Sequence, residues 1–280
     1  RREAGRRPMK DGVDILRQGF SMRKLPDDID HVIVGSGLSG LYLAALLSRI
    51  GRRVVVLEQH YIAGGCTHTF KDKGFEFDTG VHYLGQATQL AAIMDFGAGR
   101  DGAFRLQRQV LEDGSQVFNE LHLGRGFVHR TRPGRKTYAN DIVAQFPDEE
   151  KAIRRYFAEC ERAGLGMAVL FLRHFLPQRV FRALLSLPGP FRWAANRFVS
   201  RTLDQVLTEC GIKSRDLRAL LSAEFGDYGT VPDRAPFFIH ALIHAHYWEE
   251  GGFFPVGGSD TFALALVPAI LDAGGAVLVR

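Results

Sequence analysis

The sequence has few cysteines and no long apolar run, and each absence narrows the possibilities. Its only cysteines are Cys66, Cys160 and Cys210. They are odd in number, far apart and without a Cys-x-x-Cys pair, so they predict no disulfide framework and favour a reducing setting. No run of eighteen apolar residues occurs, so we expect no membrane-spanning helix within this chain.

Signatures of several other protein classes are also missing. There is no His-Glu-x-x-His motif and no nucleophile elbow with a Ser-His-Asp order, so hydrolysis has no support. The two tryptophans and scattered basic residues match no RNA-recognition, zinc-finger or helix-turn-helix signature, so we expect no nucleic-acid partner. His240 and His244 would share a helix face, but their aromatic surroundings favour packing or pocket lining over a metal site.

The composition and the chain ends add broad limits. With 46% hydrophobic and 24% charged residues, the 280-residue chain is an ordinary globular protein of one large or two interleaved domains. The net charge of +5 favours acidic partners without choosing among nucleic acid, an anionic membrane and a phosphate-bearing cofactor. Residues 1–28 predict a basic, weakly structured lead-in rather than a signal peptide. The missing initial Met and the apparent strand at 276–280 indicate an internal fragment of a longer protein.

A strand–helix–strand pattern follows the lead-in. Residues 30–34 and 53–58 predict strands, and the second is continuous and apolar like a buried parallel strand. Residues 38–50 predict a helix, with Gly51 in the C-terminal capping position. The order predicts a βαβ unit within an α/β fold.

Three glycines stand at the corner between the first strand and the helix. In a Gly-x-Gly-x-x-Gly turn, Gly35 allows the tight turn, Gly37 lets a pyrophosphate approach the backbone, and Gly40 lets the helix pack close to the strand. Glu58, at the end of the second strand, can accept both ribose hydroxyls. The pattern predicts a Rossmann-type domain for NAD or FAD, with a structural glycine turn and a surface glutamate as the alternative.

A second glycine pair, Gly64-Gly65, follows just past Glu58. A simple NAD domain would usually turn into its next helix at this point. A second glycine loop suits a longer ligand whose body runs along the protein, which favours FAD. A flexible connector is the alternative.

The pattern changes several times in the rest of the chain. Residues 75–77 predict a short strand, and residues from about 104 to 138 predict a β-meander. Helical periods are then predicted at about 148–187 with breaks at Pro177 and Pro188, twice within 201–224, within 232–248, and at about 260–272 before a final strand.

Four blocks of the sequence resemble a known flavoprotein family. They are VIVGSGLSGL, VVVLEQHYIAGGCTHTF, FEFDTGVHYLG and FFPVGGSDTFALALVPAILDAGGAVL. In them the chain is similar to the family of phytoene desaturases and carotenoid isomerases, and within it to the members that saturate a retinoid. The resemblance extends over roughly Phe20 to Arg280 and is most specific at 58–70 and 75–85.

The resemblance implies an FAD-binding Rossmann-type domain with an inserted α+β substrate domain for a polyene. The expected segments are the lead-in at 1–28, the first part of the FAD-binding domain at 29–103, the insertion at 104–250 and a truncated return to the FAD-binding domain at 251–280. The residues expected to hold the cofactor are Gly35, Ser36, Gly37, Gly40, Glu58, Gln59, Gly64 and Gly65.

The resemblance also implies a reaction, namely FAD-dependent saturation of the 13,14 double bond of all-trans-retinol, with NAD(P)H as a candidate electron donor. Desaturation or cis–trans isomerisation of a carotenoid is the alternative within the family, and a flavin-free, non-catalytic scaffold is the alternative of another class. The expected partners are retinol or a related polyene lipid and a membrane surface. The expected location is the endoplasmic reticulum membrane, with peripheral attachment or an anchor outside this chain.

Three residues are weak candidates for a catalytic role. Tyr83 follows His82 in a block that the resemblance places near the flavin, where isoalloxazine contact and simple packing are both open. Asp227 and Tyr228 offer a carboxylate and a phenol that could give a proton to a substrate carbon, with a plain turn as the alternative.

Two positions depart from the family pattern. Cys66 stands where related flavoproteins often carry Arg beside the cofactor phosphates. Val256 stands where the retinoid-saturating members tend to have Arg, which bears on the substrate more than on the cofactor.

Residues 162–203 are rich in arginine and contain no Asp or Glu. Aromatic and aliphatic residues alternate with the basic ones, which is typical of helices that lie in the interface of an anionic bilayer. The stretch therefore predicts a membrane-facing or lipid-entry surface, with an ordinary core helix and a solvated basic face as the alternative. Its arginines are Arg162, Arg173, Arg179, Arg182, Arg192, Arg197 and Arg201.

Overall fold

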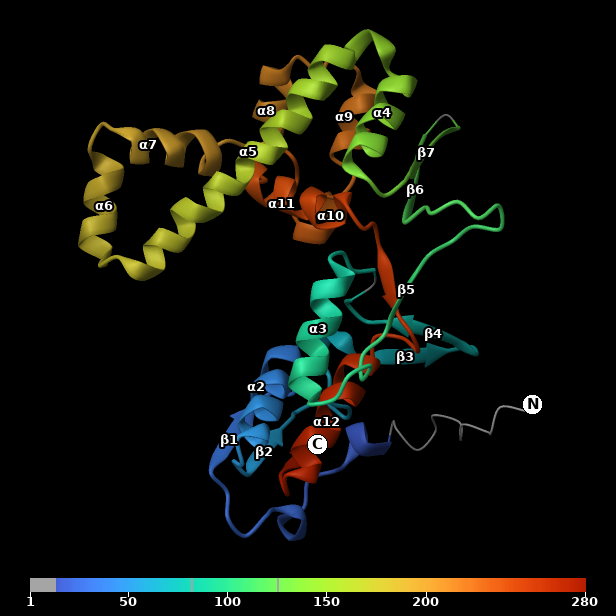
Figure 1. The fold of residues 1–280 in the computed structure, drawn as a ribbon, viewed down its shortest axis with the longest axis vertical. Coiled ribbons are helices and arrows are strands. Elements are labelled where there is room, and N and C mark those ends of the chain that lie inside the picture. Colours follow the sequence, from blue (N-terminus) through green and yellow to red (C-terminus); the bar gives the residue numbers. More distant parts are fainter. Residues whose placement is uncertain (1–13, 82, 125) are drawn as a thin grey trace. The chain divides into compact units, whose positions relative to one another are not determined.

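The computed structural model describes residues 14–81, 83–124 and 126–280, apart from the side chains of residues 165–170. The chain divides into two units (Figure 1). The first unit takes in the chain up to Arg108 and again Phe253–Arg280, and the second unit is Gln109–Gly252. The sequence had placed the inserted domain at 104–250. The first unit is thus built from two segments that lie far apart in the sequence.

A parallel sheet forms the centre of the first unit. Its strands stand in the order β1-β2-β9, with the bounds His31–Val34, Val54–Leu57 and Ala276–Leu278. The middle strand β2 pairs with both neighbours in parallel, and its valines are buried, as its continuous apolar composition predicts. Because β9 comes from the returning segment, the sheet joins the two segments of the unit.

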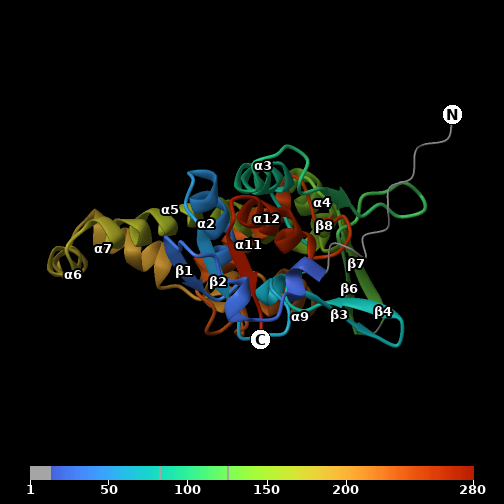
Figure 2. The same cartoon turned by 90° about the horizontal axis from the view of Figure 1, so that it is seen from below.

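Three helices of the first unit lie side by side (Figures 1 and 2). They are α2 at Leu38–Arg49, α3 at Ala87–Ala98 and α12 at Thr261–Asp272. Gly51 has φ +83°, and its N–H donates to the carbonyl of Ser48 at 3.0 Å, which confirms its place at the end of α2. The sequence did not predict α3. The core between sheet and helices includes Leu41, Val54, Phe104, Phe262 and Val277.

Two small antiparallel ladders complete the first unit. β3 (Thr69–Asp72) and β4 (Phe75–Asp78) form a hairpin, and β5 (Leu106–Arg108) pairs with β8 (Phe253–Pro255). The predicted β-meander is therefore wrong as a continuous run, because β5 takes its partner from the returning segment, whereas the strands at 119–123 and 127–131 do pair with each other. The pairing of β5 with β8 leaves no trace in the local alternation of polar and apolar residues.

The second unit combines one β-hairpin with a group of helices. Its strands are β6 at Asn119–Leu123 and β7 at Phe127–Thr131. Its α-helices are α4 at Arg135–Gln145, α5 at Glu150–Phe175, α6 at Gln178–Ser186, α7 at Pro190–Ala194, α8 at Leu203–Cys210, α9 at Arg215–Leu221, α10 at Phe225–Tyr228 and α11 at Phe237–Trp248. A π-helical turn, η5 at Ala195–Val199, continues α7.

Prolines and caps set the ends of several of these helices. Pro177 precedes α6 and Pro188 follows it, which confirms the predicted breaks. Thr202 opens α8 with a capping box: its hydroxyl accepts from the N–H of Gln205, whose side chain accepts from the N–H of Thr202. Among the described residues, no helix is long and apolar enough to cross a membrane. The core of the unit includes Tyr156, Leu207, Leu220, Phe237 and Trp248.

Candidate cofactor site

The glycine corner brings the end of β1 very close to the start of α2. Gly35 has φ +96°, a left-handed conformation that side chains rarely adopt, and its N–H donates to the carbonyl of Leu57 at 2.7 Å. A Cβ at Gly40 would collide with the carbonyl oxygen of Gly35. Gly35 and Gly40 are therefore needed by the fold itself, for the turn and for helix–strand packing.

Gly37 differs from its two neighbours, because the fold does not need a glycine there. Its φ of −60° is ordinary for any residue, and a Cβ built on it would meet no atom within 4 Å. Gly37 is the N-cap of α2, and no side chain caps the first turn of that helix. An open cradle thus lies against backbone N–H groups at a helix N-terminus, which is the setting that holds a phosphate.

The second glycine loop touches this cradle. The N–H of Gly64 donates to the backbone carbonyl of Ser36 at 3.1 Å and to its hydroxyl at 3.2 Å. A Cβ at Gly65 would stand 2.8 Å from the Cα of Gly37, so the two loops could not meet this closely with a larger residue at position 65. The structure therefore brings Ser36, Gly37, Gly64 and Gly65 together.

Glu58 lies beside the same corner with three hydrogen bonds on its carboxylate. Oε2 accepts from the N–H and the hydroxyl of Ser36 at 2.8 and 2.7 Å, and Oε1 accepts from the N–H of His60 at 2.9 Å. Burial opposes the charge, but the hydrogen bonds from Ser36 and His60 outweigh it and lower the pKa of Glu58. The group is a partly exposed, ionised acid, and an ionised carboxylate can accept further bonds from hydroxyl groups.

Aromatic and imidazole rings lie close together in the segment that follows this acid. The ring centroid of His60 lies 4.3 Å from that of Tyr61 and 4.9 Å from that of His68. The guanidinium of Arg17 stands 5.6 Å from the Tyr61 ring, and Gln59 is exposed between Glu58 and His60. The sequence interpretation did not use His60, Tyr61 or His68. Flat rings of this kind offer a surface on which a base can stack.

The returning segment is hydrogen-bonded to the hairpin that follows the second glycine loop. Asp260 accepts from the N–H and the hydroxyl of Thr69 at 2.7 and 2.8 Å, although Asp260 stands just before α12 like a capping residue. The N–H of Ser259 donates to Asp78 at 3.0 Å. Cys66, which the sequence interpretation named as a departure from the family pattern, is exposed in the loop before this hairpin. Asp260 and Asp78 thus position the loop, a role that their sequence context does not predict.

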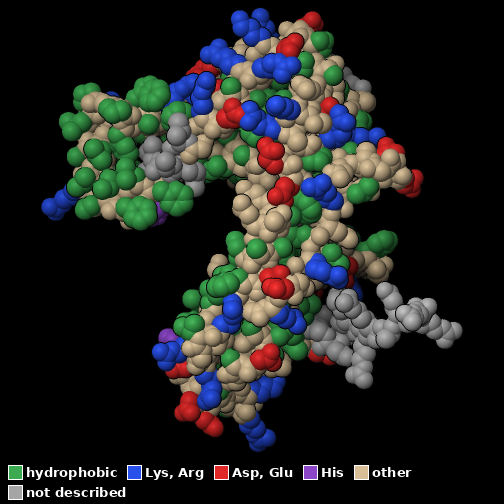
Figure 3. Space-filling model, viewed as in Figure 1, with side chains coloured by type: hydrophobic (Ala, Val, Ile, Leu, Met, Phe, Trp, Pro, Cys, Tyr) green, Lys and Arg blue, Asp and Glu red, His purple; other side chains and the backbone are tan. Residues whose placement is uncertain are grey.

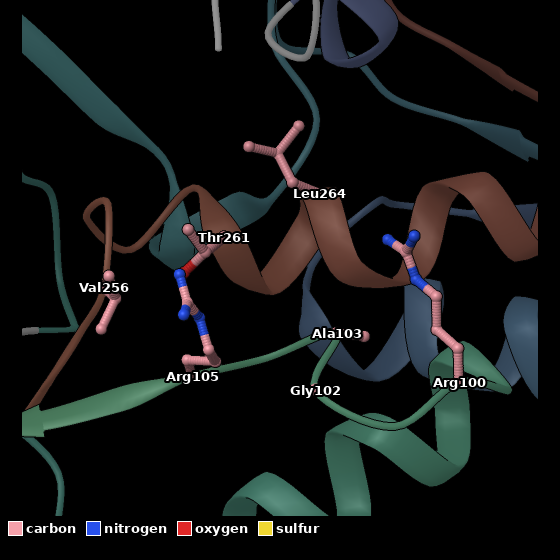
Figure 4. A pocket seen from close by; sticks show the side chains of 7 residues that line it. All are labelled: Arg100, Gly102, Ala103, Arg105, Val256, Thr261 and Leu264. Carbon is pink, nitrogen blue, oxygen red and sulfur yellow. The ribbon is translucent and has the colours of Figure 1, made fainter. Parts of the chain in front are cut away.

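A cavity of about 410 Å³ lies beside the start of α12 in the first unit (Figure 4). In Figure 4 the Arg105 side chain extends toward Thr261, while Arg100 lies further along the helix. Val256, the second departure from the family pattern, also lines the cavity. Arg100 and Arg105 thus line the same cavity as Val256.

The three catalytic candidates are divided between the units. Tyr83 is half-buried in the first unit, with its ring centroid 6.1 Å from that of Phe254, and His82 lies outside the described residues. Asp227 is exposed and Tyr228 is half-buried on α10 of the second unit. Burial, Glu224 and Asp227 raise the pKa of Tyr228 to about 12, so its phenol stays protonated at neutral pH. The roles of these three residues stay predictions.

The histidines of α11 lie in a buried polar cluster of the second unit. Nε2 of His240 lies 2.8 Å from the hydroxyl of Tyr156, and Nδ1 lies 3.0 Å from that of Tyr228. Burial lowers the pKa of His240 well below its usual value, and a neutral imidazole donates from one nitrogen only. One tyrosine therefore donates to His240 and the other accepts from it.

His244 faces an acid in the same cluster. Its Nε2 lies 3.1 Å from Oε2 of Glu224 without the alignment of a hydrogen bond, and its Nδ1 has no hydrogen-bond partner in the described part of the chain. Burial lowers the pKa of His244 to about 3, while burial and Asp227 raise that of Glu224 to about 8. Within the described ranges, no group of three or more His, Cys, Asp or Glu side chains is placed for a metal ion.

Comparisons with known proteins agree with the first unit's geometry. Residues 33–96 match the family described as NAD(P)-binding Rossmann-like domain. All-trans-retinol 13,14-reductase of Danio rerio is 41% identical over 95% of this chain, and prolycopene isomerase 1 of an Oncidium hybrid cultivar is 28% identical over 91%. The chain spans 44% and 43% of the length of these two relatives.

A solved structure supports the same fold. The crystal structure of an oxidoreductase from Methanosarcina mazei matches 89% of this chain and 50% of its own, with a TM-score of 0.54 at 20% identity. At that identity the likeness shows the fold alone, and it confirms the predicted α/β, Rossmann-type class. The resemblance inferred from the four sequence blocks is confirmed by the relatives' names and identities.

Proposed function

We propose that this chain belongs to the flavoprotein family of all-trans-retinol 13,14-reductases and is part of an FAD-dependent oxidoreductase that saturates the 13,14 double bond of all-trans-retinol. One observation carries the proposal. The open cradle at Gly37 and the ionised acid Glu58 lie together in a chain that is 41% identical to a retinol reductase over 95% of its length. Because the chain spans less than half of that relative, the activity is proposed for the full-length protein.

The residues of the first unit fit FAD in a definite order. The N–H groups at Gly37 and the start of α2 would hold the pyrophosphate, and Glu58 would accept from the ribose hydroxyls. The loop at Gly64-Gly65 would line the next part of a long ligand, since it is fixed to Ser36 on one side. This second, anchored loop favours FAD over NAD. FAD supplies hydride transfer at its N5 atom when bound.

The balance of the reaction requires an external reductant. Saturation of one carbon–carbon double bond adds one hydride and one proton, and retinol cannot supply the hydride without being oxidised itself. We therefore propose a reduced nicotinamide, NAD(P)H, as the electron donor. Tyr83, Asp227 and Tyr228 stay the candidates for delivering the proton, and Tyr228 carries one at neutral pH because its pKa is about 12.

The product mass tests this reaction against its rivals. Full-length protein, incubated with all-trans-retinol and NADPH, is expected to give a product two mass units heavier than the substrate. A desaturase would remove two mass units, and an isomerase would leave the mass unchanged. An isomerase is the second candidate because a prolycopene isomerase is 28% identical over most of the chain.

We also propose that the full-length protein acts at a membrane surface, that of the endoplasmic reticulum, by peripheral attachment or through an anchor outside this chain. A polyene alcohol such as retinol partitions into lipid, so an enzyme that consumes it gains access at the bilayer surface. Fractionation of cells that express the full-length protein, followed by a high-salt wash, separates peripheral attachment from an anchor. Recovery in the unsedimented fraction before any wash would contradict this proposal.

A further inference from the structure

Residues 171–194, which we name the basic–aromatic lobe, contain no buried side chain. The lobe comprises the end of α5, all of α6 and all of α7. Phe171 is 55% exposed, Phe175 79%, and Leu187 and Trp193 62% each. Short helices gain most of their stability by burying an apolar face. A run of 24 residues (171 to 194) with large apolar side chains in water therefore needs a partner.

The apolar side chains of the lobe gather on one surface. α6 and α7 pack against each other, with the rings of Phe181 and Phe191 5.6 Å apart. Figure 3 shows hydrophobic side chains grouped over these two helices. Exposed apolar patches of this kind mark surfaces that bind protein or lipid.

The charge of the lobe has one sign only. Arg173, Arg179, Arg182 and Arg192 are exposed on it, and no Asp or Glu occurs anywhere from 162 to 203. Among the described residues, none of these four forms an ion pair; Arg192 donates instead to the backbone carbonyl of Ser186 at 3.2 Å. The lobe therefore offers unpaired guanidinium groups next to exposed aromatic rings.

The other three arginines of the predicted membrane-facing stretch have a different role. Arg197 donates to both oxygens of Glu159 at 2.7 and 2.6 Å, Arg201 donates to Oε2 at 2.7 Å, and Arg162 donates to Oε1 at 3.1 Å. Glu159 is only 4% exposed, so these arginines neutralise a buried acid and join η5 and α8 to α5. The predicted surface at 162–203 is thereby reduced to the lobe.

We propose that the basic–aromatic lobe docks on the surface of an anionic lipid bilayer. Guanidinium groups bind lipid phosphates in pairs of hydrogen bonds, while Phe and Trp side chains enter the boundary between headgroups and acyl chains. A protein partner would have to bring acidic groups to meet four arginines, whereas an anionic leaflet presents them everywhere. The proposal rests on the membrane association proposed above and names the surface responsible for it.

Vesicle binding of the full-length protein tests the charge of the lobe. Phosphatidylcholine vesicles with and without 30% phosphatidylserine are sedimented with wild type and with a variant in which Arg173, Arg179, Arg182 and Arg192 are changed to Glu. We expect the variant to bind anionic vesicles at least tenfold more weakly than wild type. The matched control changes Arg155, Lys213, Arg215 and Arg234 to Glu, which gives the same net charge from exposed sites elsewhere on the second unit. Equal binding by both variants would overturn the proposal and leave membrane association itself intact.

Two local readouts separate lipid from a protein partner. Quenching by brominated lipids should fall when Trp193 is changed to Phe, because this exposed ring would lie among the acyl chains. A Phe175→Cys variant should gain one site that reacts with a water-soluble maleimide, in addition to the exposed Cys66, and this added site should be protected when anionic vesicles are present. Protection without vesicles would show that another part of the protein or a second copy covers the lobe, and would overturn the proposal.

Discussion

Two glutamates, one in each unit, differ in ionisation: one is ionised and the other is neutral at neutral pH. The groups around each side chain explain the difference. Glu58 at the glycine corner receives three hydrogen bonds from N–H and O–H donors, and its pKa is lowered. The carboxylate of Glu224 in the second unit lies 3.1 Å from the neutral imidazole of His244, and burial together with Asp227 raises its pKa to about 8. The first acid is ionised and able to bind hydroxyl groups, whereas the second acid is protonated and part of a core.

Glu159 shows that burial alone does not decide this outcome. It is 4% exposed, yet the arginines around it overcome the cost of burial and lower its pKa. The charge of an acid in this molecule therefore follows from the donors that reach it. We expect an ionised acid to bind a cofactor where its hydrogen-bond donors lie beside open space, as at Glu58. We expect a structural role where the acid is enclosed, as at Glu159.

The largest expected effect concerns the open space at the glycine corner. Gly37→Val should abolish flavin retention, since its side chain would occupy the cradle where the pyrophosphate meets the backbone. The fold should persist, because the φ of Gly37 is −60° and its Cβ position is free of neighbours. Flavin absorbance and circular dichroism of the purified variant measure the two properties separately. Wild-type flavin content would refute the pyrophosphate assignment.

The next largest effect tests whether arginine side chains stabilise the charge of the buried Glu159. Glu159→Gln should lower the free energy of unfolding by about 3 kcal/mol, because it removes the buried counter-charge of Arg197 and Arg201 and leaves them paired with the exposed Glu209. Glu150→Gln is the control, since Glu150 pairs with Arg154 on an exposed helix face and should cost less than about 0.5 kcal/mol. Urea unfolding of the full-length variants provides the values. Equal costs would mean that the arginine cluster is not a structural element.

Removal of the ionised acid at the corner should have a smaller but specific effect. Glu58→Ala should weaken FAD binding by roughly 1.5–3 kcal/mol, the range for hydrogen bonds to a charged group, or about ten- to hundredfold in Kd. Titration of the apoprotein with FAD, followed by fluorescence quenching, measures this change. Glu112→Ala, which alters an exposed acid elsewhere, should leave the Kd unchanged. An unchanged Kd in Glu58→Ala would separate this acid from the ribose.

The smallest effect is a pH dependence in the second unit. The folded pKa of Glu224 is about 8 against 4.5 for a free glutamate, so stability falls as pH rises between these values. The folded pKa of His244 is about 3 against 6.5, so stability falls as pH drops through that window. Of these two groups Glu224 gives the larger contribution between about pH 7 and 8, with a slope of up to about 1.36 kcal/mol per pH unit.

The variant Glu224→Gln should remove that slope, because glutamine is neutral throughout. Unfolding free energies measured at pH 6.5, 7.2 and 8 would show a flat profile in the variant and a falling one in wild type. A falling profile of equal slope in both proteins would assign the titration to another group.

Local patterns were sufficient to predict the βαβ unit and the helix breaks. Strand β2 is a continuous apolar run, Gly51 caps α2, and Pro177 and Pro188 bound α6, so each feature depends on neighbouring residues. The α/β class and the grouping of the two glycine loops follow from such signals. The role of Gly37 in pyrophosphate binding stays a prediction, although the fold itself does not require glycine at that position.

Contacts between distant segments could not be predicted in this way. β5 pairs with β8, Asp260 binds Thr69, and Arg197 and Arg201 reach Glu159 from beyond α5. Each of these contacts joins parts of the chain that share no local pattern. Asp260 would have been interpreted as a helix cap from its sequence position. The arginines were likewise assigned to one membrane-facing stretch because their shared acid lies outside it.

The central claim is that the corner at Gly37 and Glu58 holds FAD. The most direct test is to purify the full-length protein, denature it in the dark, and identify the released chromophore by absorbance and mass. The account predicts one FAD per protein chain. Release of no flavin, or of NAD in its place, would contradict it.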